Sequence, residues 1–284
     1  MIATVRKRKT GKAGETSSTV PVISLLTDFG ISDYFVGAVK GVILSINPDA
    51  QLVDITHEIP PHDIAAAAFT LLAAYQSFPP NTIHLAIVDP GVGSNRRPVI
   101  AKTRAGTFVG PDNGIFSYVL EQAADYDLFH ITDQQYFRAS VSNSFHGRDI
   151  FAPVAAALSR GARPKAFGPK IVDPVVLPSL KPLRKKNGLE GRIIHIDTFG
   201  NCITNFTKAD MLENPRLLVK GKRINTFKQY FSEQTGSRAE LFGIWGSAGF
   251  LEIAATNKSA ARLLRAKRGD AAKLVKSREH DNKS

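Results

Sequence analysis

The sequence predicts an α/β protein in which a layered N-terminal α/β domain with a mostly parallel sheet precedes a smaller C-terminal antiparallel β domain. Strand-like apolar runs alternate with helical spacing through residues 22–159, which is typical of a sheet covered by helices. Several of these runs end on acidic or glycine-rich loops, as at the ligand-binding edge of open α/β sheets. After residue 188 the pattern changes to short apolar runs separated by tight turns.

The first domain is expected over residues 21–178. Continuous apolar runs predict buried strands at 22–27, 51–56, 82–88, 98–103 and 107–109. Apolar residues at helical spacing predict helices at 34–46, 64–77, 115–123 and 150–159. Pro48, Pro79 and Gly161 follow three of these helices and support their ends there.

Prolines and basic side chains then come together, and residues 179–188 are expected to form a basic linker. The second domain is expected over residues 189–276, starting with strands at 191–196 and 202–206 joined by a tight turn. Two hairpins are predicted around residues 220–222 and 246–249, where glycine lies between strand-like runs.

The chain of 284 residues carries a formal net charge of +12. The excess bases lie in residues 1–20, 179–188 and 262–284, and the remainder is close to neutral. Residues 1–20 are expected to be a disordered basic tail and residues 277–284 a second tail. Because such charge runs are usually solvated, no specific nucleic-acid partner is expected. A nucleic-acid-binding protein acting through its basic tails is kept as an alternative.

The sequence favours a cytoplasmic protein without membrane contact. It contains no run of about 18 apolar residues, the length that a membrane span needs. No apolar stretch follows the basic N-terminus, as it would in a secretory signal. The chain has one cysteine, Cys202, so an intramolecular disulfide is excluded.

Acidic residues follow three predicted strands, at Asp28, Asp89 and Asp112. The carboxyl ends of parallel strands meet at one edge of a sheet, where ligands bind. These carboxylates could grip sugar hydroxyls or activate water. The alternative is that each one caps a helix or closes a turn, and for Asp28 taken alone that is the favoured interpretation.

Arg96 follows Asp89 by seven residues, and the glycines between them allow a ligand to approach the backbone. The arginine could pair with Asp89 and keep it ionised, and Arg97 is the neighbouring candidate for that role. His146 lies where a helix is predicted to begin, which lowers the pKa of a histidine. A neutral His146 could take a proton from water.

A metal site is the weaker chemical alternative. His57, His62 and Asp63 lie close in sequence and could form part of a metal-dependent hydrolase, but no further ligands are evident. The sequence lacks a P-loop, a GxSxG nucleophile elbow, an HExxH motif and a cysteine pair for zinc.

Six motifs in order resemble those of the S-adenosyl-L-methionine (SAM) hydroxide adenosyltransferases, adenosine-forming SAM hydrolases related to the fluorinases and chlorinases. They are TDFG at 27–30, DPGVG at 89–93 with Arg96, PDNG at 111–114, FHGRD at 145–149, DTFGN at 197–201 and SAGFLEI at 247–253. The resemblance covers residues 22–276. It implies an enzyme that hydrolyses SAM to adenosine and L-methionine without a cofactor or metal. It also implies a homotrimer, with SAM between the N-terminal domain of one subunit and the C-terminal domain of the next.

The resemblance also implies a role for particular residues. The catalytic Asp, Arg and His of the family correspond to Asp89, Arg96 and His146, and the ribose-binding Asp corresponds to Asp28. These residue types suit that reaction: Asp89 and His146 can orient the water and accept its proton, while Arg96 would hold Asp89 and stabilise the developing hydroxide. Contacts to adenine and to the methionine end correspond to five further residues: Asp197, Phe199, Asn201, Ser247 and Glu252.

A SAM-dependent halogenase is the alternative within the same family. The halogenating relatives carry Tyr at the position of Asp89, lack the His at His146 and have Ser at Gly147. A carboxylate at residue 89 would repel halide, so the resemblance favours hydrolysis. Ala248 stands where fluorinases have an Arg that grips the methionine carboxylate, and backbone amides or Ser247 are expected to hold that group here.

Overall fold

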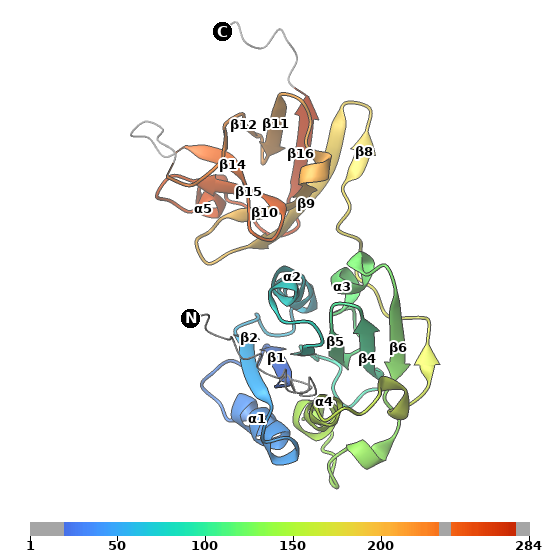
Figure 1. The fold of residues 1–284 in the computed structure, drawn as a ribbon. Helices are drawn as coiled ribbons and strands as arrows, with labels where there is room; N and C mark the ends of the chain where they lie inside the picture. Colours follow the sequence, from blue (N-terminus) through green and yellow to red (C-terminus); the bar gives the residue numbers. More distant parts are fainter. Residues whose placement is uncertain (1–19, 233–239, 277–284) are drawn as a thin grey trace, which may run out of the picture.

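The computed structural model describes residues 20–232 and 240–276. The described chain forms two sheets, one in each half of the sequence (Figure 1). The first has the strand order β2-β1-β3-β5-β4-β6-β7, parallel from β2 to β5 and antiparallel from there on. The second is antiparallel apart from the β13–β14 pair. The predicted fold class is therefore confirmed.

Most strands of the first sheet occur where the apolar runs predicted them. The strands of this sheet are β1 (Val22–Thr27), β2 (Gln51–Thr56), β3 (Ile83–Ile87), β4 (Pro98–Thr103), β5 (Thr107–Pro111), β6 (Tyr126–His130) and β7 (Lys170–Ile171). Every residue of β3 is buried, because the strand lies inside a parallel sheet with both faces covered.

Helices cover both faces of this sheet. On one face α1 (Phe35–Ile46) and α4 (Ala152–Ser159) enclose one apolar core, and on the other α2 (Ile64–Ala74) and α3 (Ser117–Gln122) enclose a second core. Asp63 caps α2 by accepting a hydrogen bond from the backbone of Ala66. Short helical turns lie at Tyr75–Ser77, Gln134–Tyr136, Gly147–Phe151 and Pro164–Ala166.

Where the second half is described, it contains short strands and one short helix. They are β8 (Leu183–Lys185), β9 (Gly188–Ile196), β10 (Cys202–Thr207), β11 (Pro215–Val219), β12 (Lys222–Ile224), β13 (Phe227–Lys228), β14 (Leu241–Trp245), β15 (Phe250–Ala255), α5 (Ala260–Leu264) and β16 (Ala271–Lys276), with a helical turn at Lys208–Asp210. The hairpins β11–β12 and β14–β15 form at the two predicted turns.

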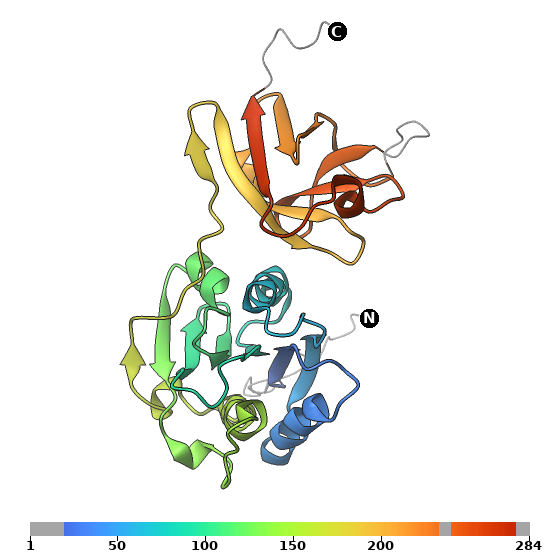
Figure 2. The ribbon, with the colours of Figure 1, turned by 180° about the vertical axis from the view of Figure 1, so that it is seen from behind.

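Helix α2 packs against the second sheet, as both ribbon views show (Figures 1 and 2). The ring of Phe69 stacks on His195 with the ring centroids 4.9 Å apart and lies 5.9 Å from Phe250. Arg268 Nη1 lies 2.6 Å from the Asp63 carboxylate at the same boundary. These contacts fix how the two halves face each other.

Some elements differ from the sequence predictions. Within the predicted linker, β8 pairs with β9. The sequence patterns did not reveal β6, β7, β13, β16 or α5. The predicted helix at 150–159 begins with a π-helical turn, so regular α-helix starts at Ala152.

The domain boundaries stay a prediction, and most of the predicted tails, residues 1–19 and 277–284, lie outside the described residues. Among the residues that are described, no helix has the length and apolar character needed to cross a bilayer.

Candidate active site

The parallel strands β1, β3 and β5 bring three predicted acidic residues to one edge of the first sheet. Asp28 follows β1, Asp89 follows β3 soon after its end, and Asp112 follows β5 directly. Asp28 and Asp89 line one cavity of 290 Å³. Asp112 instead binds Arg97, with Nη2 2.6 Å from Oδ2, and is buried. Of the three carboxylates, two therefore belong to a candidate site and the third is structural.

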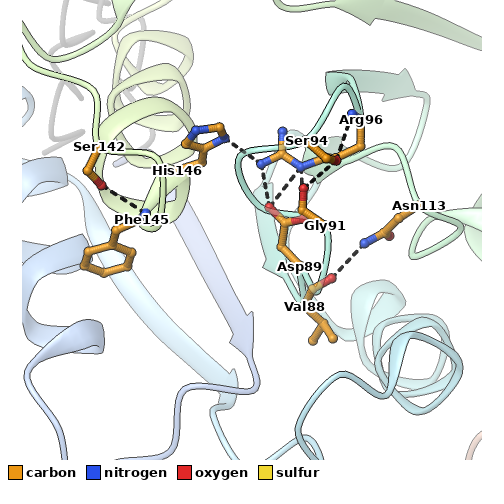
Figure 3. A network of polar contacts seen from close by, with 9 residues as sticks. All are labelled: Val88, Asp89, Gly91, Ser94, Arg96, Asn113, Ser142, Phe145 and His146. Carbon is orange, nitrogen blue, oxygen red and sulfur yellow. Dashed lines mark hydrogen bonds and ion pairs between the residues drawn. The ribbon is translucent and has the colours of Figure 1, made fainter.

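Asp89 and Arg96 form the predicted ion pair in a bidentate geometry (Figure 3). Arg96 Nε donates to Oδ1 at 2.9 Å, and Nη2 donates to Oδ2 at 2.5 Å. The side chain of Asp89 is only 7% exposed and that of Arg96 only 10%. The guanidinium carbon also lies 5.2 Å from the centre of the Phe151 ring. The pair is fixed in place by its own hydrogen bonds and by this aromatic contact.

His146 completes this network through the same arginine. Arg96 Nη2 lies 2.7 Å from His146 Nδ1 (Figure 3). A guanidinium only donates hydrogen bonds, so Nδ1 must accept, and a neutral His146 carries its single proton on Nε2. The imidazole therefore presents an N–H donor on its far side. This arrangement suits orienting a water molecule better than accepting its proton.

Two loops must approach closely for this network to form. Gly93 has φ of +78°, and a Cβ at this position would lie 2.5 Å from the carbonyl oxygen of Asn143. The loop that carries Arg96 therefore touches the loop before His146 only because residue 93 has no side chain. On the second loop, the fully buried Asp149 accepts hydrogen bonds from the Ser142 backbone and from Arg148. Asp149 thus holds the loop rather than capping a helix.

The two adjacent arginines have separate roles. Arg96 contacts Asp89 and His146, whereas Arg97 binds Asp112 and Asp173. The structure thus assigns Arg96, the predicted member, to the candidate site. Arg97 ties the end of β5 to the segment around residue 173.

Burial lowers the pKa of His146, and the neighbouring Arg96 lowers it further, against smaller opposing effects of Asp89 and Asp149. A proton on Nδ1 would also face the guanidinium that donates to this nitrogen. Both effects favour the neutral imidazole at neutral pH.

If this network is catalytic, we expect turnover to persist below pH 6.5 and then to fall in acid as His146 becomes protonated. The folded protein binds this proton more weakly than the unfolded chain. The free energy of unfolding is therefore highest above pH 6.5 and falls as the pH drops through the lowered pKa of His146. The measurement is kcat against pH for wild type and for His146→Asn, in which the amide oxygen can accept from Arg96. The variant should lose this acid limb; an unchanged limb would contradict the assignment.

The cavity beside this network has an aromatic wall and a second carboxylate. Phe29, Phe35 and Phe145 line it and contact one another, with ring centroids 5.2 to 5.9 Å apart. Asp28 Oδ2 accepts a hydrogen bond from the backbone of His62 at 2.9 Å. This contact fixes the carboxylate and leaves Oδ1 available to a ligand. The three phenylalanines were not predicted, although each lies within one of the site motifs or close behind it.

The other predicted substrate-binding residues line a different pocket. This pocket, of 1360 Å³, lies in the second sheet and is lined by Asp197, Phe199, Asn201, Ser247 and Glu252. Asp197 organises its own turn by accepting hydrogen bonds from the backbones of Phe199 and Asn201 and from the Asn201 amide. The turn presents Phe199, which is 80% exposed. Trp245 and Phe231 line the same pocket and were not predicted.

The described chain does not bring the two groups of site residues into one pocket. The cavity at the first sheet and the pocket at the second share no lining residue. Each holds part of what the motifs predicted: the cavity is lined by Asp28, Asp89 and His146, and the second pocket has an exposed aromatic ring with polar neighbours.

The alternative metal site does not form among the described residues. His57 Nδ1 hydrogen-bonds with the buried Thr27 at 2.8 Å, and Asp63 caps α2 and pairs with Arg268. His62 lines the cavity beside Asp28. These side chains point to separate partners, and the described ranges contain no cluster of three or more candidate metal ligands.

Comparisons with known proteins agree with these motifs. Residues 23–168 match the SAM hydroxide adenosyltransferase N-terminal domain, and residues 191–273 match the C-terminal domain of the same family. A protein of Methanocaldococcus jannaschii named (R)-S-adenosyl-L-methionine hydrolase is 36% identical over 259 residues, which cover 86% of this chain and 91% of the relative.

Two further proteins show how far the similarity extends. The crystal structure of an uncharacterized conserved protein from Thermotoga maritima aligns with a TM-score of 0.84 at 36% identity, over 89% of this chain and 100% of that chain. A fluorinase of Nocardia brasiliensis is 24% identical over 223 residues, which are 69% of this chain and 74% of the fluorinase. The family match spans both halves of the sequence, and the chain belongs to the SAM hydroxide adenosyltransferase family.

Proposed function

We propose that this protein hydrolyses SAM to adenosine and L-methionine by attack of water on ribose C5′. The observation that carries the proposal is the Asp89–Arg96–His146 network beside a cavity that also contains Asp28. An ionised acceptor, a fixed cation and an imidazole N–H donor are the groups that a water nucleophile requires. The 36% identical relative, named a hydrolase of (R)-SAM, supports the same reaction.

The reaction forms one bond to oxygen and breaks one to sulfur. The water oxygen attacks C5′ in line with the C5′–S bond, and the bonding electron pair leaves with the sulfur of methionine. The sulfonium becomes a neutral thioether, so the leaving group needs no protonation. Asp89 accepts the proton of the attacking water and later releases it to solvent.

The remaining residues position these reactants. His146 donates its Nε2–H to the water and directs the lone pair of the oxygen toward C5′. Arg96 holds both groups and stabilises negative charge that develops on the oxygen. Asp28 accepts hydrogen bonds from the ribose hydroxyls and so fixes the position of C5′.

We propose that no metal or cofactor takes part. A sulfonium is already an activated leaving group, so no Lewis acid is needed to polarise the bond that breaks. The groups that activate and orient the water are side chains of this chain, and the site must also exclude bulk water. On this view, treatment of the protein with EDTA leaves its turnover unchanged.

The cavity favours water over halide as the nucleophile. The Asp89 carboxylate repels an anion at the position where the nucleophile must bind. Gly147 is also packed tightly, since a Cβ at this position would lie 3.3 Å from both Phe145 and Phe29. A serine at residue 147 would therefore need these two rings to shift by a few tenths of an ångström before its hydroxyl could donate to a halide.

Identification of the nucleoside product tests this function. The EDTA-treated protein is incubated with SAM in chloride buffer, and the products are separated and identified by mass. We expect adenosine and methionine in equal amounts. Chlorinated nucleoside would instead indicate a halogenase, and the absence of any product would contradict the proposal. The name of the relative specifies the (R) form, so both sulfonium epimers are supplied separately, and we expect faster turnover of the (R) epimer.

We also propose that two copies of the chain contribute to each active site, within a homotrimer. The water-activating residues and the second pocket lie apart in one chain, and Phe199 is exposed at that pocket. A head-to-tail assembly would place the second pocket of one copy over the cavity of the next and would cover the Phe199 side chain.

Mixing two inactive variants tests the shared site. Asp89→Ala removes the base from the cavity at the first sheet. Asn201→Ala alters the turn that lines the pocket at the second sheet. Each variant alone should be inactive or nearly so. When the two chains are co-expressed, random assembly of a ring should restore about a quarter of the wild-type sites. No gain in activity over the separate variants would contradict a site shared between copies.

For the cell, we propose a cytoplasmic location without membrane attachment. The single cysteine, Cys202, is buried, and burial raises its pKa to about 11, so the thiol stays protonated. SAM and adenosine are the proposed binding partners. The alternative of nucleic-acid binding depends mainly on residues 1–19 and 277–284, which lie outside the described part of the chain.

A further inference from the structure

His57 is a buried histidine that the proposed reaction does not use. It follows β2 directly, and only 4% of it is exposed. Its ring nitrogen Nδ1 lies 2.8 Å from the hydroxyl oxygen of Thr27, the last residue of β1. The next residue along the chain is Asp28, the proposed ribose contact in the cavity at the first sheet. His57 itself does not line that cavity, so it can act on a ligand only through its neighbours.

A register shift between the first two strands places His57 beside Thr27. Leu25 of β1 lies opposite Asp54 of β2, but the next residue of β1 lies opposite Thr56, so β2 holds one extra residue at this point. Continuing the shifted register puts His57 next to Thr27, whereas the unshifted register would put Thr56 there. An extra residue redirects the side chains that follow it, and such shifts are frequent next to functional sites.

The hydrogen bonds around His57 run in one direction. Nε2 lies 3.0 Å from Asp54 Oδ1, an ion-pair approach that lacks the geometry of a hydrogen bond. Burial opposes the charge of Asp54, but Lys40 and His57 hold the pKa of this carboxyl below its usual range, so it is ionised. An ionised carboxylate only accepts, so the ring carries its proton on the Nε2 side, and Nδ1 accepts from the Thr27 hydroxyl. The oxygen of that hydroxyl accepts in turn from the backbone N–H of Phe29 at 3.2 Å.

His57 binds the turn at residues 27–30 on both sides of Asp28. Its side chain binds Thr27, which precedes Asp28. Its backbone carbonyl accepts from the N–H of Gly30 at 2.8 Å, and Gly30 has φ of +66°. A turn that is held at both ends presents its side chain in fewer orientations, so less conformational freedom is lost when a ligand binds. Of these two contacts, only the one through the side chain can be removed by substitution.

We infer that His57 is a positioning residue for the ribose: its side chain holds the turn at residues 27–30 so that the Asp28 carboxylate is ordered before the ligand binds. This inference rests on the proposed function for the assignment of the ribose to Asp28. Because Asp28 binds the nucleoside and not the attacking water, loss of the His57 side chain affects affinity for the nucleoside more than turnover. A residue that only stabilised the fold would not separate these two quantities.

The same strand supplies a matched control. His84 of β3 is 1% exposed, and its Nδ1 lies 2.7 Å from the hydroxyl oxygen of Ser24. The two histidines therefore make the same kind of contact with β1, at residues 24 and 27. Ser24 lies near the start of β1, however, and neither it nor His84 lines the cavity. Replacing His84 thus measures the cost of losing a buried histidine of this kind without disturbing the turn.

Nucleoside binding by the full chain tests the inference. Calorimetry measures the dissociation constant of adenosine for wild type, His57→Leu, His57→Asn and His84→Leu, and thermal unfolding measures the stability of each. Leucine removes both ring nitrogens, whereas asparagine keeps an acceptor near the position of Nδ1. His57→Leu should weaken adenosine binding about tenfold, and His57→Asn should recover most of that loss. His84→Leu should leave binding within about twofold of wild type despite a similar loss of stability.

Two further comparisons separate positioning from stability. In the Asp28→Ala background, His57→Leu should change adenosine binding by less than about twofold, since its effect passes through Asp28. At saturating SAM, kcat of His57→Leu should stay within about twofold of wild type while KM rises about tenfold. If His57→Leu does not fold, Thr27→Val replaces it, because valine keeps the shape of threonine and removes the hydroxyl. Thr27→Ser, which keeps the hydroxyl, is then the conservative variant.

Equal effects of His57→Leu in the wild-type and Asp28→Ala backgrounds would overturn the inference, as would equal losses of binding for His57→Leu and His84→Leu. Unchanged adenosine binding in a folded variant, no recovery in His57→Asn, or a fall in kcat without a rise in KM would also overturn it. Absence of adenosine binding by the wild-type protein would do the same.

These outcomes are separable from the product assay. If wild-type protein binds adenosine through this turn but releases none from SAM, the proposed hydrolysis is wrong and the positioning role of His57 stands. If adenosine is released and His57→Leu binds it as tightly as wild type does, the hydrolysis stands and the positioning role is wrong.

Discussion

Asp89→Asn should reduce kcat by about 10²–10⁴-fold while the affinity for adenosine changes little. The substitution keeps the size of the side chain and can still accept from Arg96, but it removes the charge that takes a proton from water. The effect belongs in turnover, because Asp89 is assigned to the attacking water and not to the nucleoside. Single-turnover kinetics and adenosine titration measure the two quantities separately.

The neighbouring ion pair of Asp112 and Arg97 supplies a matched control for the effect of Asp89→Asn on turnover. Asp112→Asn removes the same charge from a second buried aspartate, which binds Arg97 through the same kind of contact. Each substitution should lower the free energy of unfolding by about 1–3 kcal/mol. Only Asp89→Asn should abolish turnover. Comparable losses of activity in both variants would show that the effect of Asp89 comes from stability and not from catalysis.

Asp28→Ala should weaken adenosine binding about a hundredfold or more, because it removes two charge-assisted hydrogen bonds of about 1.5–3 kcal/mol each. It also releases the backbone N–H of His62, which now donates to Asp28. At saturating SAM the loss of turnover should be smaller than for Asp89→Asn. Calorimetry with adenosine measures the affinity directly, without any reaction.

Asp33→Ala is the control for that measurement. Asp33 lies five residues after Asp28 on the same loop and is exposed. Its removal takes the same charge from this edge of the sheet without touching the cavity. If both substitutions weaken adenosine binding alike, the effect of Asp28 is a general charge effect and its assigned ribose contact is wrong.

Much of the first half could be predicted because local signals agree with the tertiary structure there. The apolar runs of β1 and β3 are nearly or fully buried, and their parallel pairing brings the residues after them to one edge. The spacing of Asp89 and Arg96 was enough to predict their pairing. Within the family motif, the same seven-residue spacing favoured Arg96 over the adjacent Arg97, which binds a different aspartate.

Other features depend on contacts between distant residues. The strand β16 was missed because it alternates lysines with apolar residues in a basic region, and β8 was missed because prolines and lysines surround its three residues. The proton position on His146 depends on an arginine 50 residues away.

The central claim is that water attacks ribose C5′, and the source of the 5′ hydroxyl oxygen of adenosine tests it most directly. The protein is incubated with SAM in water enriched in oxygen-18, and both products are analysed by mass spectrometry. Attack of water on C5′ predicts one oxygen-18 atom in each adenosine, at the 5′ hydroxyl, and none in methionine. Unlabelled adenosine, or label in the amino-acid product, would mean that water does not attack C5′ and would contradict the proposed mechanism.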